Sequence, residues 1–153
     1  MQEIGRGEDW GVYTGGKLLV VRSLGPAHRE TIDLVYDTLQ SMMQKTTGQV
    51  GFALITGAEA MPPEGDDRKR VSDLLKEHAD RIAGVGMVML AQGFRGAIVR
   101  SAASALFVLP RPGYTTKIFG DEASCAQWLA GRMTESEREI VECLQATREV
   151  FAG

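Results

Sequence analysis

Residues 50–90 read VGFALITGAEAMPPEGDDRKRVSDLLKEHADRIAGVGMVML, and this stretch decides the fold. It begins with a short apolar run at 50–55 and ends with another at 84–90, each of strand length. Between them, after a loop rich in Gly and Pro, apolar residues recur at helical spacing over 66–82. Continuous apolar runs suit strands buried on both faces, and a helix between two such strands implies that they are parallel. The sequence therefore predicts an α/β protein.

The rest of the chain extends this pattern in both directions. Before it, Gly15-Gly16 joins two short strands as a hairpin, and a helix over 27–45 follows. The elements predicted after residue 90 are a helix of small residues over 94–109, a strand at 115–119, a helix over 121–131 and a helix over 134–151. Thr134 and Glu137 have the spacing of a capping box. Together these elements predict a mixed sheet of about five strands, antiparallel in the hairpin and parallel later, with about five helices.

Length, composition and charge indicate one domain without a strong bias toward nucleic acid or membrane. The chain has 153 residues, of which 44% are hydrophobic, and its net charge is −3. We expect a flexible lead-in at 1–10, a domain at 11–132 and a helical extension of that domain at 133–153. The negative net charge argues against general nucleic-acid binding. No apolar run approaches the roughly 18 residues of a membrane span and no apolar signal segment precedes the domain, so we expect a cytoplasmic protein without stable membrane insertion.

Residue types that carry metal or nucleophile chemistry are sparse. The two cysteines, Cys125 and Cys143, and the two histidines, His28 and His78, form no C-x-x-C or H-x-x-x-H pattern. We expect the cysteines to act as small buried hydrophobes in a reducing compartment. From the sequence alone, a disulfide between them and a Cys–His pair assembled by the fold both stay open. The absence of a catalytic motif predicts a chain that is not an enzyme and binds no metal or cofactor.

The stretch 117–129 carries a resemblance to a known family. It reads KIFGDEASCAQWL, a basic residue followed by a short strand ending in Phe, an acidic cap and a Trp-Leu pair. With the order of the elements before it, this ending resembles the STAS domains, and more closely their SpoIIAA-like branch, over residues 16–132. The resemblance implies a SpoIIAA/STAS-like sandwich. It also implies a regulatory or protein-binding module that is not catalytic.

The same resemblance implies a phosphorylation site. In STAS antagonists, a serine at the start of the second helix, after the third strand, is phosphorylated by a partner kinase, and the phosphate adds charge where the partner docks. The matching place in this chain is Thr56 to Glu59 and the loop that follows. The family's Asp-Ser-Ser-Gly does not occur there, and Ser72 lies inside the predicted helix. Thr56 and Ser72 are therefore the candidate phosphorylation sites.

The distribution of charge points to a second candidate site. No Asp or Glu occurs from residue 82 to 120, a stretch that contains several basic residues. Within it, a glycine-flanked turn follows a predicted strand and begins a helix, where backbone N–H groups and a guanidinium can bind an anion or an acidic partner. The candidate binding residues are those of this turn and of the loop expected to face it: Gly93, Phe94, Arg95, Gly96, Thr56 and Glu59. The alternative is that acids are excluded because the strands and helix of this stretch are buried.

These observations favour a non-catalytic regulatory or protein-interaction module that binds a protein partner, with a homodimer as a further possibility. The alternative is a carrier or sensor of a small anionic or lipid-like ligand, held between the 93–96 turn, the 56–65 loop and the 94–109 helix. A carrier requires a cavity of roughly 300 Å³ or more near Phe94. We expect Trp128 to anchor its helix in the core, and the last helix to fold back on the domain before it would dimerise.

Overall fold

The computed structural model describes residues 1–61, 63–90, 97 and 114–151 of the chain. Its centre is a mixed sheet whose six strands lie side by side in their order along the chain. The strands are β1 (Gln2–Arg6), β2 (Trp10–Gly15), β3 (Leu18–Ser23), β4 (Val50–Thr56), β5 (Ile82–Met89) and β6 (Thr116–Phe119). The first three are antiparallel neighbours, whereas β3 to β6 are parallel. The predicted division into an N-terminal hairpin and later parallel strands is confirmed.

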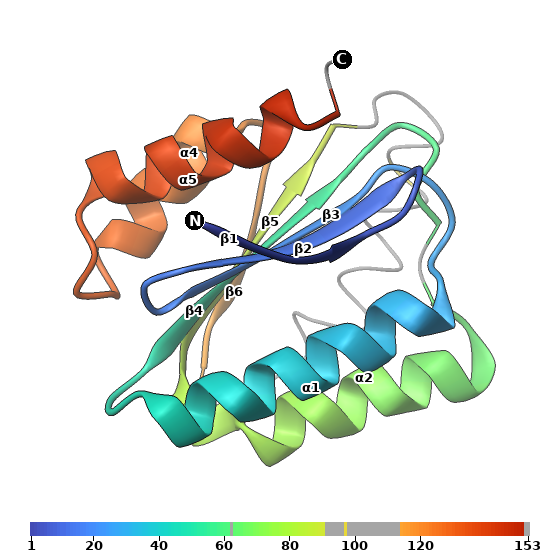
Figure 1. Cartoon of the computed structure of the whole chain (residues 1–153), viewed down its shortest axis with the longest axis horizontal. Coiled ribbons are helices and arrows are strands. Elements are labelled where there is room, and N and C mark those ends of the chain that lie inside the picture. Colours follow the sequence, from blue (N-terminus) through green and yellow to red (C-terminus); the bar gives the residue numbers. More distant parts are fainter. Residues whose placement is uncertain (62, 91–96, 98–113, 152–153) are drawn as a thin grey trace.

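Helices cover both faces of this sheet (Figure 1). They are α1 (Arg29–Lys45), α2 (Gly65–Glu77), the short 3-10 helix η1 (Ala79–Arg81), α4 (Glu122–Ala130) and α5 (Glu137–Glu149). α1 and α2 lie together on one face, and α4 and α5 lie together on the other. The chain is thus a three-layer sandwich, as the alternation of strands and helices predicts.

Each face of the sheet has its own hydrophobic core, because successive side chains of a strand point to opposite faces. On β3, Leu19 and Val21 belong to the core under α1 and α2, whereas Val20 belongs to the core under α4 and α5. All eight residues of β5 are buried, as expected for a strand with helices on both sides. The apolar runs that decide the fold are therefore the central strands of the sheet.

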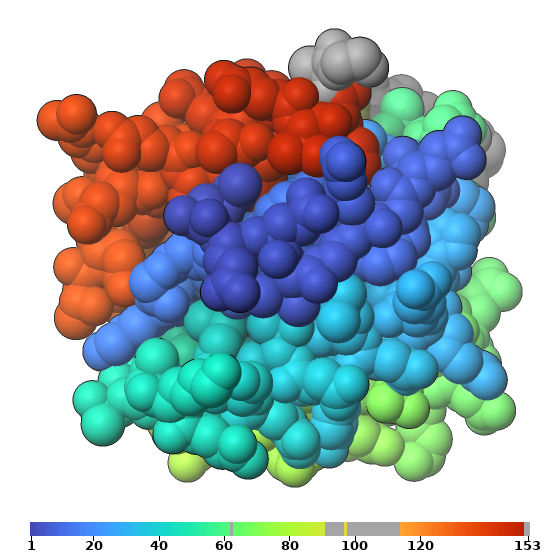
Figure 2. All heavy atoms as spheres, in the orientation of Figure 1, coloured from blue at the N-terminus to red at the C-terminus, as the bar shows by residue number. Residues whose placement is uncertain are grey.

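The N-terminus corrects one expectation from the sequence. Residues 2–6, which we expected to belong to a flexible lead-in at 1–10, form β1 and pair with β2, so the sheet has six strands and not five. Most side chains of β1 are at least partly exposed, and such an edge strand lacks the apolar alternation by which strands are recognised. Figure 2 shows these dark blue residues on the surface, between the red atoms of α5 and the cyan atoms of α1.

The helices differ from expectation in number and at one boundary. The structure describes four α-helices, and the helix expected over 94–109 lies outside the described residues except for Ala97. The last helix begins at 137 and not at 134, because Ser136 is its N-cap. The Ser136 hydroxyl accepts from the Glu139 N–H at 3.2 Å, and the Glu139 carboxylate accepts from the Ser136 N–H at 2.7 Å. A capping box is therefore present two residues later than predicted.

The core under α4 and α5 contains several apolar residues of the 117–129 stretch. Trp128 is partly buried in it, and its ring centroid lies 5.6 Å from that of Phe119. A Cβ placed on Gly84 of β5 would lie 2.9 Å from the Trp128 ring, so this glycine lets the indole approach the sheet. Cys125 and Cys143 are both buried and free. They pack as small hydrophobes, as expected, and form no disulfide with each other.

Candidate functional site

The C-terminal ends of β3, β4 and β5, with the loops that follow β3 and β4, form a candidate site. In open α/β sheets this edge is the usual place of binding, because its loops vary without disturbing the sheet. The Gly57 N–H donates to the Ser23 carbonyl at 2.9 Å, which holds the ends of β3 and β4 together. The loops that follow these two strands meet again in a parallel bridge between Pro26 and Met61. The sheet therefore fixes the position of both loops.

An apolar pocket of about 120 Å³ opens at this edge, between the sheet and the two helices α1 and α2. Its apolar walls include Ile32, Val35, Phe52, Leu74, Leu75 and Met87. The volume is well below the roughly 300 Å³ that a carrier of a larger ligand requires. Phe94, near which we expected such a cavity, lies outside the described residues.

A few polar residues border the pocket, among them two near the start of α1. Thr31 lines it and is only 8% exposed, yet no group in the part of the chain that the structure describes is hydrogen-bonded to its hydroxyl. Thr56 also lines it, and its hydroxyl donates to the Val88 carbonyl at 3.3 Å. His28, the N-cap of α1, makes no side-chain cap and instead lies 3.0 Å from the Asp9 carboxylate. The hydroxyl oxygen of Thr31 is itself enclosed, and the lining of the pocket is almost entirely apolar.

Two large apolar side chains are exposed at this edge. Met61 lines the pocket and is 41% exposed, and Leu90, at the end of β5, is 43% exposed. The Leu90 N–H donates to the Thr56 carbonyl at 3.0 Å, which places Leu90 beside the strand end that borders the pocket. Among the described residues, the chain-terminal Met1 is the other large hydrophobic side chain that is this exposed. These two side chains make the edge a candidate contact surface.

The structure places the predicted site residues as follows. Thr56 and Glu59 are both at this edge, Thr56 buried under the pocket and Glu59 exposed in the loop after β4. Ser72 lies in the middle of α2 and is partly buried. The turn expected to bind an anion, Gly93, Phe94, Arg95 and Gly96, lies outside the described residues. Binding at that turn and phosphorylation of Thr56 or Ser72 stay predictions, and a kinase would reach the Thr56 hydroxyl only after the loop had moved.

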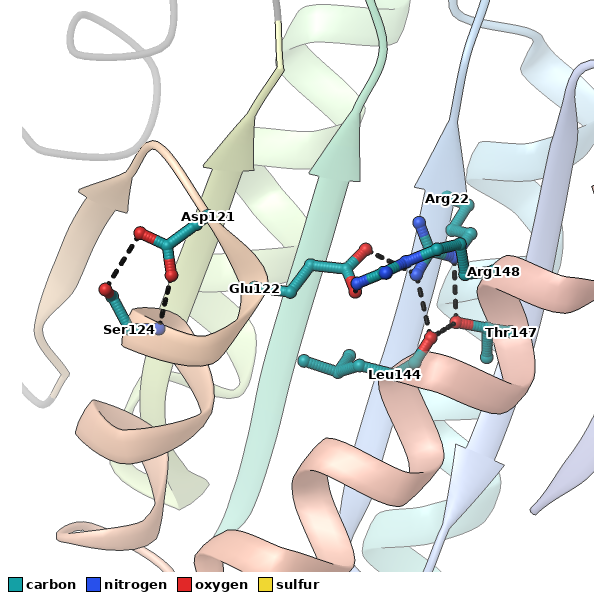
Figure 3. A network of polar contacts seen from close by, with 7 residues as sticks. All are labelled: Arg22, Asp121, Glu122, Ser124, Leu144, Thr147 and Arg148. Carbon is teal, nitrogen blue, oxygen red and sulfur yellow. Dashed lines mark hydrogen bonds and ion pairs between the residues drawn. The ribbon is translucent and has the colours of Figure 1, made fainter. Parts of the chain in front are cut away.

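A buried ion pair on the opposite face of the sheet holds the remaining helices in place (Figure 3). Arg22, at the end of β3, is 2% exposed, and its Nη2 donates to Glu122 Oε1 of α4 at 2.6 Å. The same Nη2 donates to the Leu144 carbonyl of α5 at 2.8 Å, and its Nε donates to the Thr147 hydroxyl at 2.8 Å. One guanidinium therefore joins β3, α4 and α5.

The Glu122 carboxylate completes this network. Its second oxygen accepts from Arg148 Nη2, so the carboxylate lies between two guanidinium groups. Asp121, one residue earlier, caps α4 by accepting from the Ser124 N–H at 2.7 Å (Figure 3). That hydrogen bond lowers the pKa of Asp121. Sequence reasoning missed the network. Its one local signal is a charged residue, Arg22, in the apolar run LLVVRS.

The described residues bring together few groups suited to catalysis. Within 1–61, 63–90, 97 and 114–151, no cluster of three His, Cys, Asp or Glu side chains is arranged to hold a metal ion. Burial raises the pKa of the Cys125 thiol to about 12 and also raises that of Cys143, so neither is a ready nucleophile at neutral pH. No helix in these same ranges is long and apolar enough to cross a membrane.

Comparison with known proteins adds evidence on the fold. No protein-family model matches the chain, and no curated protein matches it. Among solved structures, the chain is similar to an uncharacterised DUF3478-family protein with a SpoIIAA-like fold from Shewanella loihica PV-4. The two chains are 16% identical with a TM-score of 0.55, and the match covers 78% of this chain and 91% of that one. The chain has a SpoIIAA-like fold. Another similar structure is from the complex of the diguanylate cyclase SiaD with its activator SiaC from Pseudomonas aeruginosa, at 13% identity and a TM-score of 0.50, over 78% of this chain and 100% of that one. Two structures thus support the SpoIIAA-like fold that the 117–129 stretch implies.

Proposed function

We propose that this chain is a non-catalytic regulatory module that acts by binding a protein partner at the C-terminal edge of β3, β4 and β5. The observation that carries the proposal is the pair of exposed apolar side chains there, Met61 and Leu90, beside a pocket too small for a typical cofactor. In a typical interface, a few well-buried residues provide most of the binding energy.

The comparisons support this proposal in general terms. SiaC, whose complex with SiaD contains a chain similar to this one, is the activator of a cyclase, and so a regulator that works through a protein partner. The partner of the present chain is a different question, because 13% identity carries the fold and not the partner. A second copy of the chain is one candidate partner, and a cytoplasmic location remains part of the proposal.

Site-specific crosslinking tests the proposal. A photocrosslinking amino acid at position 61 is expected to capture one defined protein, identified by mass spectrometry, whereas the same amino acid at the exposed position 145 of α5 is not. The captured protein is then purified and its affinity measured by calorimetry. We expect Met61→Asp to weaken the complex at least about tenfold, because it places a charge in an apolar contact. The matched control, Gln145→Asp, is expected to leave the affinity unchanged.

Two results would contradict the proposed surface. One is a complex that Met61→Asp and wild type form with equal affinity. The other is efficient crosslinking from position 145 with none from position 61. If the captured protein is the chain itself, sedimentation of the wild type and of Met61→Asp distinguishes a homodimer through this edge from one through another face.

A further inference from the structure

The strand β6 forms one open edge of the sheet. Among the described strands it pairs with β5 alone, and its register runs without a shift from Thr116 to Phe119. The Val85 N–H donates to the Thr115 carbonyl at 2.9 Å, so the backbone of Thr115 faces β5. Because successive residues of a strand point their backbone groups to opposite sides, the N–H and carbonyl groups of Thr116 and Ile118 face away from the sheet. Such a row of groups can pair with a further strand.

The opposite edge of the sheet is less suited to such pairing. There, β1 has an irregular register between Glu3 and Gly5. An irregularity of this kind bends an edge strand and interrupts its row of hydrogen-bonding groups. The Arg6 guanidinium lies 3.7 Å from the Glu3 carboxylate, so the two charges of β1 already have each other as partners. The regular edge, with unpaired charges, is that of β6.

Positive charge lines the edge at β6. Lys117 is exposed, and its Nζ lies 5.5 Å from the centroid of the Phe119 ring. Arg132, exposed just after α4, has its guanidinium carbon 4.7 Å from the centroid of the Trp128 ring, which itself packs against Phe119. Neither cation forms an ion pair with a carboxylate in the part of the chain that the structure describes. No Asp or Glu occurs from residue 82 to 120, so β5 and β6 contribute no acidic side chain. We call Lys117, Phe119, Trp128 and Arg132 the cationic edge.

The charge of this edge limits what can pair with it. Two copies of the chain joined β6 to β6 about a twofold axis would bring their cationic edges together, and like charges across a strand pair repel. A nucleic acid would neutralise the cations, but it has no peptide backbone to pair with the outward N–H and carbonyl groups of β6. An extended polypeptide with acidic side chains satisfies both the charges and the backbone groups.

The two faces of β6 define the residue pattern of that polypeptide. Phe119 packs with the core under α4 and α5, and Lys117, two residues earlier, points to the same face. Ile118 is half-buried and packs against the core under α1 and α2. Side chains of an added strand alternate in the same way. Acidic residues at alternate positions would therefore face the cationic edge, and the apolar residues between them would face Ile118.

We propose that the β6 edge binds an extended segment of a protein partner, in which acidic and apolar residues alternate, as an added strand of the sheet. The backbone groups of Thr116 and Ile118 hold the segment, and the cationic edge selects it by charge. The proposal goes beyond the protein-binding function described above. It uses the lateral edge of the sheet, whereas Met61 and Leu90 lie at the strand ends, and neither surface requires the other.

Two short capped peptides serve as probes, one that alternates Glu with Val and one that alternates Lys with Val. Each is titrated into the full chain at low ionic strength, where charge attraction is least screened, and followed by the NMR signals of backbone amides. The acidic peptide is expected to shift the amide signals of Thr116 and Ile118 and to bind at least about tenfold more tightly than the basic peptide. Met61→Asp is expected to leave this affinity unchanged, so the test is independent of the surface proposed above.

A pair of double variants tests the role of charge. Lys117→Gln with Arg132→Gln is expected to weaken binding of the acidic peptide about three- to tenfold, because two ion pairs with the peptide are lost. The matched control is Arg68→Gln with Lys76→Gln, which removes the same charge from exposed positions of α2 in the other layer. The control is expected to bind the acidic peptide as wild type does.

N-methylated peptides distinguish strand pairing from charge attraction alone, and they need only the wild-type chain. N-methylation of the Val residues blocks an antiparallel added strand, and N-methylation of the Glu residues blocks a parallel one, because the N–H groups that face β6 belong to different residues in the two orientations. One of these two peptides is expected to lose binding and the other to keep it.

The proposal is overturned by any of four results. The acidic peptide leaves the Thr116 and Ile118 amide signals of wild type unchanged, or the basic peptide binds as tightly as the acidic one. Both methylated peptides bind as well as the unmodified peptide, or the Lys117→Gln, Arg132→Gln variant binds the acidic peptide as tightly as its control.

Discussion

Replacing Glu122 with Gln removes the charge that compensates the Arg22 guanidinium on the α4 and α5 face of the sheet. The Arg22 side chain is 3% exposed and that of Glu122 is 8% exposed, and they are 2.6 Å apart. Water therefore cannot take over the role of the carboxylate. Removing one partner of a buried ion pair typically costs about 3–5 kcal/mol, because an uncompensated charge stays in the interior.

This cost is large relative to the stability of a domain of this size, which is about 5–15 kcal/mol. The Glu122→Gln chain is thus expected to lose a large fraction of its free energy of unfolding. Arg138 and Glu142 provide the control. They form an ion pair of 2.8 Å on the surface of α5, with side chains 87% and 59% exposed. Glu142→Gln is expected to cost less than about 1 kcal/mol, because exposed pairs gain little over solvated charges.

The assay is urea unfolding followed by circular dichroism. It compares wild type, the single variants Glu122→Gln and Arg22→Met, their double variant, and the surface control Glu142→Gln. The double variant is expected to be more stable than Glu122→Gln alone, because it removes the charge left unpaired. Equal losses for Glu122→Gln and the surface control would refute this reasoning. So would a double variant whose loss is the sum of the two single losses, because coupled partners are not additive.

Two further predictions concern packing and pH. Gly86→Ala is expected to lower the free energy of unfolding by about 1–3 kcal/mol in the same assay, because the new Cβ would lie 2.5 Å from Cys125 Sγ. Adding Cys125→Ala to that variant is expected to recover part of the loss, and an unchanged urea midpoint for Gly86→Ala would contradict the packing. The hydrogen bond from the Ser124 N–H lowers the pKa of Asp121. The Asp121 carboxylate therefore stabilises α4 fully above the ordinary aspartate pKa, and this stabilisation is lost as pH falls through the lowered pKa. An NMR titration that gives Asp121 an ordinary or raised pKa would contradict the cap.

The sequence was sufficient for the parts of the fold that rest on local patterns. The runs at 50–55 and 84–90 predicted two central parallel strands, which the structure has as β4 and β5. The local pattern did not predict β1, because its residues are too exposed to alternate between apolar and polar. β1 pairs with β2 through backbone hydrogen bonds, which any sequence can make. The capping pattern in the sequence placed the N-cap of α5 at Thr134, two residues before the observed N-cap, Ser136. Ser, Thr and Glu residues overlap there, so the same pattern fits both positions.

The site was less predictable because its contacts join residues far apart in the chain. The position of Thr56 and Glu59 at the C-terminal edge of the sheet was predictable, because they follow an apolar strand. Thr31 gave no signal, since one threonine in an amphipathic helix is ordinary and only the structure shows that its hydroxyl has no partner among the described residues. Arg22 and Glu122 are 100 residues apart, and their pairing follows from where β6 ends and α4 begins. Such pairings depend on tertiary structure and have no local pattern.

Hydrogen–deuterium exchange of the chain, alone and in complex with the protein captured from position 61, tests the central claim most directly. If the partner docks at the C-terminal edge of β3, β4 and β5, the loop after β4 and the first turn of α1 become protected, while α4 and α5 exchange as in the free chain. Protection confined to α4 and α5, with an unchanged loop after β4, would place the partner on the opposite layer and contradict the account.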